Sequence, residues 1–314
     1  MEMRQALCEC LDEMMAENEN IVVIDADLAK PNGTFPLRKK YPERAIDVGI
    51  AEQNMASVAA GMSSYGFIPF ITSFTPFASR RICDQIAISI AYAKQNVKII
   101  GSDPGISAEF NGGTHMSMED IGVLRSIPEL VIYEPVDVAQ FKQALPQIVA
   151  YEGPVYIRMF RKTIDDVFTN ADYKFDLFHA DCIQEGNAVT IFCSGIMVQE
   201  TMKANEILKQ EGIDAEIINI HTIKPIDRDA VVASAKKTGA VVVAENHHVI
   251  GGLTSAVCEV LMEEYPVPLR AVGVKDRFGQ VGKMPFLKEE YHMTAKDIVS
   301  AVKEVIKLNT STLR

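Results

Sequence analysis

Short runs of β-branched and other apolar residues alternate with helix-like segments along the chain, and this alternation restricts the possible folds most strongly. Apolar strands without a polar face are typical of parallel sheets that helices cover on both sides. In the first half we expect strands at residues 20–24, 45–50, 68–71, 97–101, 131–133 and 155–158. Helices are expected between them near residues 3–17, 51–62, 77–95 and 137–150.

The same alternation returns in the second half of the chain. Strands are expected at residues 188–193, 215–220, 240–245 and 268–274, with helices near 197–211, 227–238, after 251–253 and at 295–307. Between the halves lies a polar, aromatic stretch with little periodicity. The chain therefore predicts an α/β fold of two domains with mainly parallel sheets flanked by helices, at residues 1–162 and 186–314, joined by a linker at 163–185.

Composition narrows the class of protein. The 314 residues suffice for two domains, and a net charge of −11 argues against a nucleic-acid or anionic-membrane surface as partner. No apolar run reaches the roughly 18–20 residues that span a bilayer, and no signal peptide is visible. The six cysteines form no CxxC pair, so we expect buried thiols of a cytoplasmic protein, without a disulfide frame or a zinc site.

Loops at the carboxyl ends of parallel strands form the sites of such folds. The most informative of these residues is Glu52, which stands where the apolar run of residues 45–50 turns into a helix, at the positive end of the helix dipole. One interpretation is a carboxylate that caps the helix. The other is a catalytic carboxylate, because a carboxylate among apolar neighbours is costly without a partner.

Several phosphate-binding motifs are missing from the sequence. There is no Gly-x-Gly-x-x-Gly after a strand, no Walker loop, and no Gly-Asp-Gly with a downstream Asn that would hold magnesium and a diphosphate. Gly112 and Gly113 alone are a weak phosphate signal.

Six segments, taken in order, carry a resemblance to a known family. They are DADL at 25–28, VGIAEQNM at 48–55, TSFTPF at 72–77, NGGTHMSMEDIGVLRSIP at 111–128, GPVYIRMFR at 153–161 and AENHHVIGGL at 244–253. Through them the chain resembles the carboxyl-terminal half of the transketolase family, with its thiamine diphosphate pyrimidine-binding domain and its C-terminal domain. The resemblance implies a beta-type subunit of a split transketolase. An N-terminal-type partner subunit would bind the diphosphate and Mg²⁺, in an α2β2 heterotetramer.

The resemblance also implies roles for the cofactor half of the site. Glu52 matches the glutamate that contacts N1′ of the aminopyrimidine, where a carboxyl favours the imino tautomer that deprotonates the thiazolium. Phe74 and Phe77 match the aromatic pair around that ring, and Asp27 matches an aspartate beside the thiazolium. His115 matches a catalytic histidine that contacts the substrate oxygen near the reacting carbon.

The substrate half departs from the family pattern. Arg4 and Arg161 match arginines that hold a sugar phosphate. Arg158 lies close to Arg161 in the sequence but is interpreted as a decoy, that is, as an arginine that does not hold the phosphate. Three positions differ, each on the substrate side: Asn111 replaces an aspartate, Ser102 a phosphate-contacting histidine and Pro31 a phosphate-contacting serine. We therefore expect transfer of a two-carbon ketol unit from a ketose or its phosphate to an aldose or its phosphate, with substrates other than the common pentose phosphates. No metal ligand is expected in this chain, and His247 and His248 are interpreted as structural.

Two alternatives remain open at this stage. The beta subunits of pyruvate-type dehydrogenases and 1-deoxyxylulose-5-phosphate synthase share the layout and the glutamate, but both decarboxylate a 2-oxo acid. The GGTH segment at residues 112–115 favours a transketolase. A non-catalytic scaffold is disfavoured because Glu52, Phe74 and Phe77 are all present.

Overall fold

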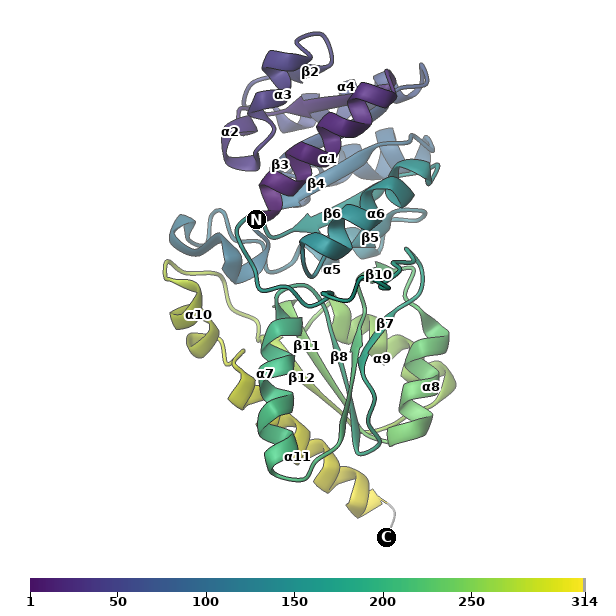
Figure 1. The fold of residues 1–314 in the computed structure, drawn as a ribbon, viewed down its shortest axis with the longest axis vertical. Helices are drawn as coiled ribbons and strands as arrows, with labels where there is room; N and C mark the ends of the chain where they lie inside the picture. The colour runs from purple at the N-terminus through teal and green to yellow at the C-terminus, as the bar shows by residue number, and fades with distance from the viewer. Residues whose placement is uncertain (313–314) are drawn as a thin grey trace.

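The computed structural model describes residues 1–312, with side chains through residue 309, and shows two α/β bodies one above the other (Figure 1). The sheet of the upper body has seven strands in the order β10-β5-β6-β4-β3-β1-β2. Its strands are β1 (Ile21–Asp25), β2 (Ala45–Asp47), β3 (Ile68–Phe74), β4 (Lys98–Ser102), β5 (Val131–Tyr133), β6 (Val155–Met159) and β10 (Thr222–Lys224). Strands β1 to β6 pair in parallel, whereas β10 is antiparallel to β5.

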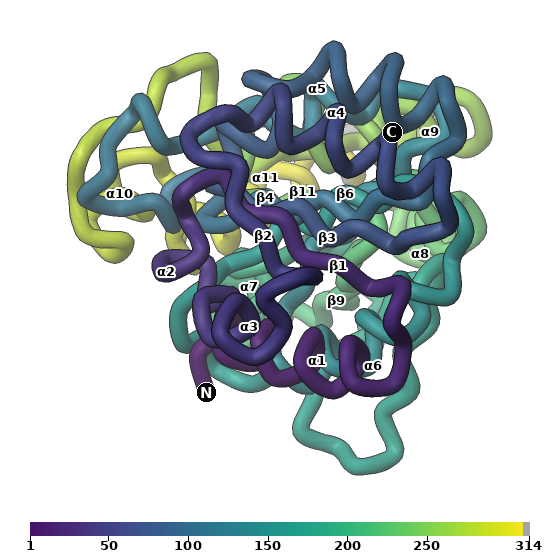
Figure 2. Tube along the Cα trace, turned by 90° about the horizontal axis from the view of Figure 1, so that it is seen from above, coloured from purple at the N-terminus to yellow at the C-terminus, as the bar shows by residue number. Residues whose placement is uncertain are grey.

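Helices cover both faces of this sheet, as Figure 2 shows from above. On one face lie α1 (Met3–Glu17), α3 (Phe35–Lys40) and α6 (Val138–Ala150), and on the other α4 (Glu52–Ser63), α5 (Asp120–Arg125) and the π-helix η2 (Gln85–Tyr92). Buried apolar residues fill each interface, for example Leu7 and Phe141 on the first face and Met55 and Ile86 on the second. The short elements α2 (Ala29–Asn32), η1 (Arg80–Ile82) and η3 (Gly105–Asn111) lie in connections.

The lower body has a five-stranded sheet in the order β12-β11-β8-β9-β7. Its strands are β7 (Asp181–Gln184), β8 (Val189–Cys193), β9 (Ala215–Asn219), β11 (Val241–His248) and β12 (Leu269–Val274). Its helices are α7 (Met197–Gln210), α8 (Arg228–Thr238), α9 (Leu253–Glu264), α10 (Met284–Glu290) and α11 (Ala295–Thr312). The predicted architecture of two mainly parallel sheets flanked by helices is confirmed.

Several details differ from the sequence predictions. Strand β7 lies inside the range expected as a linker, and β10 returns to the upper sheet from the second half of the chain. The helix expected at residues 77–95 is divided into the 3-10 turn η1 and the π-helix η2. The prediction that all cysteines are buried was wrong, because Cys182 is exposed and only Cys10 and Cys193 are buried, although all six are free thiols.

A buried ionic network fastens the two bodies together around Arg158. Its guanidinium donates to Asp120 Oδ2 (2.8 Å), to Glu134 Oε1 (2.5 Å) and to the carbonyl oxygen of Asn246 (2.7 Å). Ser194 of the lower body donates to Glu134 as well (2.7 Å). Arg158 is thus engaged at the domain junction, in line with its interpretation as a decoy.

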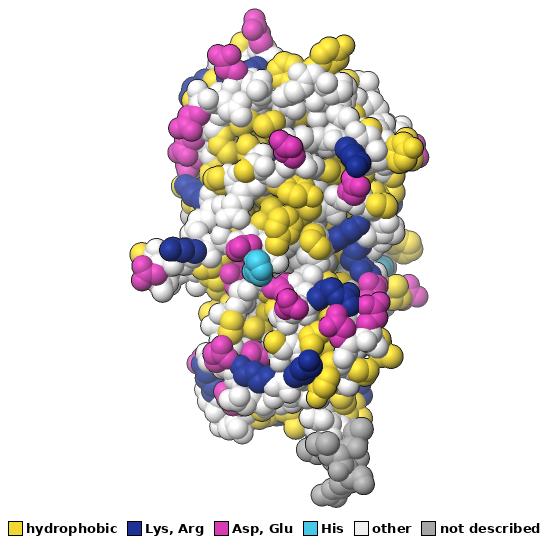
Figure 3. All heavy atoms as spheres, turned by 90° about the vertical axis from the view of Figure 1, so that its right-hand side faces the viewer, with side chains coloured by type: hydrophobic (Ala, Val, Ile, Leu, Met, Phe, Trp, Pro, Cys, Tyr) yellow, Lys and Arg dark blue, Asp and Glu magenta, His cyan; other side chains and the backbone are white. Residues whose placement is uncertain are grey.

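The outer surface mixes charged and apolar side chains. On the face that Figure 3 shows, acidic and basic side chains are interspersed around hydrophobic ones. Among the described helices, none combines the length and the apolar character that a bilayer crossing requires.

Candidate active site

Glu52 is the first residue of α4, and its side chain is held by an ion pair that the sequence did not reveal. The residue is only 4% exposed, and its Oε1 accepts a hydrogen bond from Arg81 Nη1 at 2.6 Å. Arg81 itself is 41% exposed. The carboxylate is therefore buried but compensated, and its partner can still reach solvent.

Aromatic rings surround this ion pair. The Arg81 guanidinium lies 3.7 Å from the centroid of the Phe77 ring, in a cation–π contact. Phe77 is 6.3 Å from Phe74, and the His115 imidazole packs edge-on against both rings at 5.2 and 6.1 Å. The structure thus brings Glu52, Phe74, Phe77 and His115 together, although they come from three separate segments of the chain.

A cationic corner adjoins the Phe74 ring. The Arg161 guanidinium lies 5.0 Å from that ring's centroid and donates to the carbonyl oxygen of Pro31 at 3.2 Å. Arg4 Nη1 points at the same carbonyl oxygen at 3.4 Å, and the Arg4 amide donates to the Arg161 carbonyl oxygen at 3.0 Å. The two arginines expected to hold a substrate anion are therefore neighbours.

Asp103 is the residue of this corner that sequence reasoning missed. Its carboxylate ion-pairs with Arg161 and is 2% exposed, and its Oδ1 has no hydrogen-bond partner among the described residues. Burial raises the pKa of Asp103, while the charges of Arg161 and Lys162 act in the opposite direction. The only sequence signal for this residue was its position directly after strand β4.

Ser102, by contrast, faces the interior. Its hydroxyl donates to Asn32 Oδ1 (2.7 Å), and Asn32 in turn donates to the hydroxyl of Thr72 (3.2 Å). Thr72 then bonds to the carboxylate of Asp25, whose pKa is raised by burial. Ser102 is fully buried in this network, so a contact between its hydroxyl and a substrate stays a prediction.

The remaining predicted residues lie in the connections that follow β1 and β4. Asp27 is exposed after β1, and its amide donates to Asp47 Oδ1 at 3.0 Å. Asn111 is the exposed last residue of η3, and His115 is half-buried in the segment after it, where the His115 ring hydrogen-bonds the Thr114 hydroxyl at 2.8 Å. A Cβ at Gly113 would lie 2.4 Å from the Gly279 carbonyl oxygen, so the lower body packs closely against this segment.

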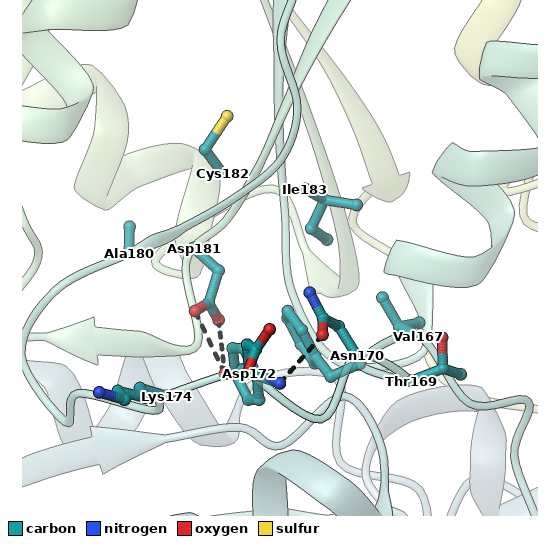
Figure 4. A pocket seen from close by; sticks show the side chains of 11 residues that line it. Val167, Thr169, Asn170, Asp172, Lys174, Ala180, Asp181, Cys182 and Ile183 are labelled. Atoms are coloured by element: carbon teal, nitrogen blue, oxygen red, sulfur yellow. Dashed lines mark hydrogen bonds between the residues drawn. The ribbon is translucent and has the colours of Figure 1, made fainter.

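Other polar clusters belong to the scaffold. Figure 4 shows a hollow lined by residues 167–170, 172–174 and 180–183, in which Asp181 accepts hydrogen bonds from Tyr173 at 3.2 Å. Among the described residues, one group of three potential metal ligands is close together, formed by Cys182, Glu185 and Glu216. Lys237 already ion-pairs with both of these glutamates. His247 is buried between Asp120 and Glu245, which supports its structural interpretation.

Together, these features define a two-domain α/β protein with an acid-and-aromatic pocket beside a cationic corner. Two family models match it: the transketolase pyrimidine binding domain over residues 1–165 and the transketolase C-terminal domain over residues 179–298. The chain therefore belongs to the transketolase family, as the subunit that carries these two domains in a split transketolase. Family membership makes it a transferase subunit, and the family uses thiamine diphosphate.

Known relatives match the chain over nearly its whole length. It is 53% identical over 303 residues to the 6-deoxy-6-sulfo-D-fructose transketolase subunit SqwH of Clostridium sp. (strain MSTE9), covering 96% of this chain and 94% of that protein. It is 31% identical to an apulose-4-phosphate transketolase subunit of Phocaeicola vulgatus, covering 97% of each. A solved structure described as a split gene transketolase, inactive beta4 tetramer, superposes with a TM-score of 0.91 at 43% identity, over 98% of this chain and 99% of that one.

The residues present fit the aminopyrimidine part of thiamine diphosphate. A nearly buried carboxylate is suited to a hydrogen bond with a ring nitrogen, and two adjacent phenylalanine rings offer faces for a flat heterocycle. Glu52, Phe74 and Phe77 would therefore hold this part of the cofactor.

Proposed function

We propose that this chain is the pyrimidine-binding subunit of a split, thiamine diphosphate-dependent transketolase that transfers a two-carbon ketol unit from a ketose to an aldose. The observation that carries the proposal is the buried Glu52 carboxylate beside the Phe74 and Phe77 rings, with His115 packed against both. An N-terminal-type partner subunit would bind the diphosphate and Mg²⁺.

The chain's own residues have distinct tasks in this reaction. When bound, thiamine diphosphate supplies the nucleophilic carbon that attacks the ketose carbonyl. Glu52 would share a proton with N1′ of the aminopyrimidine, in a pocket dry enough to keep that hydrogen bond strong. His115 would donate a hydrogen bond to the substrate oxygen as it gains negative charge. The Glu52 carboxylate accepts a hydrogen bond from Arg81 in this structure. When the aminopyrimidine binds, the Arg81 side chain must therefore turn aside or share the carboxylate with the ring nitrogen.

The substrate we propose is a ketose with an anionic group at the end far from its carbonyl. Arg4 and Arg161 provide guanidinium groups for such an anion at the corner beside Phe74. The similarity to a 6-deoxy-6-sulfo-D-fructose transketolase subunit favours a sulfonate over a phosphate as this group. Asn111 would contact a sugar hydroxyl on the same side.

Exposed apolar side chains around the pocket support a partner subunit. Ile50, two residues before Glu52, is 77% exposed. Phe110, Phe278 and Val281 are exposed as well, on two segments that pack together near His115. Apolar side chains gathered beside a functional pocket are typical of a surface that another chain covers. We expect an α2β2 assembly in which the partner closes the pocket.

The test is reconstitution of the chain with its candidate partner, thiamine diphosphate and Mg²⁺. One reaction contains 6-deoxy-6-sulfo-D-fructose and an aldose phosphate, and a second contains pyruvate and the same aldose phosphate. Ketose cleavage without carbon dioxide is the expected result. Carbon dioxide from pyruvate with the ketose untouched would instead assign the chain to the decarboxylating enzymes of this fold.

A further inference from the structure

The charges of the cationic corner carry an inference about what kind of anion it selects. Three cations lie on the neighbouring segments 2–4 and 161–162, and each already has a carboxylate partner. Arg161 pairs with Asp103, Arg4 with Glu2, and Lys162 with Glu109. These six formal charges sum to zero before any substrate is bound.

The three carboxylates differ in how strongly water screens them. The side chain of Asp103 is 2% exposed, whereas that of Glu2 is 31% exposed. A buried charge acts at a lower effective dielectric than an exposed one, so Asp103 contributes most of the compensation that a bound anion experiences. Asp103 also acts on Arg161, which lies over the Phe74 ring. That ring in turn packs against His115.

From this geometry we infer that Asp103 is a specificity-determining residue that makes the corner select a monoanionic sulfonate over a dianionic phosphate. The inference rests on the proposed function and deepens it. Arg161 and Arg4 can still donate hydrogen bonds to anionic oxygens. The second charge of a phosphate, however, meets the buried Asp103 carboxylate with no free cation of this trio to offset it. A sulfonate carries one charge and meets less repulsion.

The variant Asp103→Asn tests this with little disturbance of the backbone. Asp103 has a φ of 53°, and asparagine is one of the few residues that adopt this left-handed region readily. The asparagine carbonyl oxygen can still accept the hydrogen bond from Arg161, so the variant removes mainly the charge. Glu2→Gln is the matched control, because it removes the charge beside the other arginine at a more exposed position.

The experiment compares 6-deoxy-6-sulfo-D-fructose with D-fructose 6-phosphate at about pH 7.5, where phosphate esters are mainly dianionic. Turnover is measured with the reconstituted enzyme, and equilibrium binding of each sugar with the purified chain by calorimetry. In Asp103→Asn the ratio of phosphate to sulfonate kcat/KM should rise by about tenfold or more, and in Glu2→Gln by less than about threefold. The wild-type chain should bind the sulfonate sugar more tightly.

Two outcomes would overturn the inference. One is an unchanged ratio in a folded Asp103→Asn variant, and the other is a wild-type chain that binds the phosphate sugar as tightly as the sulfonate. If the variant fails to fold, the binding of the two sugars by the wild-type chain can still overturn the inference. If neither ketose is turned over but the wild-type chain binds the sulfonate more tightly and Asp103→Asn removes that preference, the proposed reaction fails while the role of Asp103 stands.

Discussion

The ion pair between Glu52 and Arg81 allows stability and catalysis to be separated by two substitutions. Arg81→Met leaves a carboxylate that is 4% exposed without its 2.6 Å partner. Stranding a fully buried charge costs about 3–5 kcal/mol, but Arg81 is 41% exposed, so we expect about 1–3 kcal/mol here. Glu52→Gln keeps an oxygen that accepts from Arg81, and should cost less than about 1 kcal/mol.

The double variant is the decisive comparison. Once Glu52 is an amide, the loss of Arg81 strands no charge. The double variant should therefore lose about 1–2 kcal/mol less stability than the sum of the losses in the two single variants. Thermal unfolding of the purified chain measures this, at roughly 2–4 °C per kcal/mol for a chain of this order of size. In the reconstituted enzyme, Glu52→Gln should abolish turnover despite its small effect on stability. Additive losses of stability would mean that the Glu52 charge does not depend on Arg81, and an active Glu52→Gln enzyme would mean that the carboxylate is not needed for turnover.

Three further predictions concern other parts of the molecule. Asn111→Asp should alter the relative kcat/KM for hydroxylated substrates, and identical ratios would remove Asn111 from the site. Burial raises the pKa of Glu245 from 4.5 to about 7, so the folded chain retains a proton that the unfolded chain releases. The free energy of unfolding should therefore fall as pH rises between these values, and Glu245→Gln should remove that contribution in denaturation curves recorded across the range. Arg158→Met should destabilise the chain by about 3–5 kcal/mol in urea unfolding, because it strands the buried carboxylates of Asp120 and Glu134. A loss under about 1 kcal/mol would show that water reaches this network.

The parallel sheets could be predicted because their strands are buried on both faces. β1 and β8 are buried at every position, and each has a mainly apolar sequence. Strand β7 is only partly buried and contains Asp181, and it carries no comparable pattern. Strand β10 has three residues, and its pairing with β5 depends on how the two bodies pack. Such edge strands are set by tertiary contacts rather than by local sequence.

In the candidate site, the residues at the ends of strands could be predicted from the sequence, whereas their partners from turns could not. Glu52 stands at a strand-to-helix corner, and Phe74 ends a strand, so their common edge follows from the parallel order. The partner of Glu52 could not be predicted, because Arg81 comes from a turn 29 residues away whose course deviates from a regular helix. Ser102 is the last residue of β4 and its hydroxyl bonds into the interior, whereas Asp103 follows the strand with a φ of 53° and ion-pairs with Arg161, a backbone turn that no local pattern predicts.

We propose that this chain supplies the pyrimidine half of a ketol-transfer site, and isotope tracing is the experiment that addresses this role at the level of the transferred carbons. The reconstituted enzyme would receive 6-deoxy-6-sulfo-D-fructose labelled with carbon-13 at its first two carbons, together with an unlabelled aldose phosphate. The expected product is a ketose that contains both labelled carbons still bonded to each other, detected by their mutual coupling in carbon NMR. A product without the intact labelled pair, formed while the donor is consumed, would contradict this role.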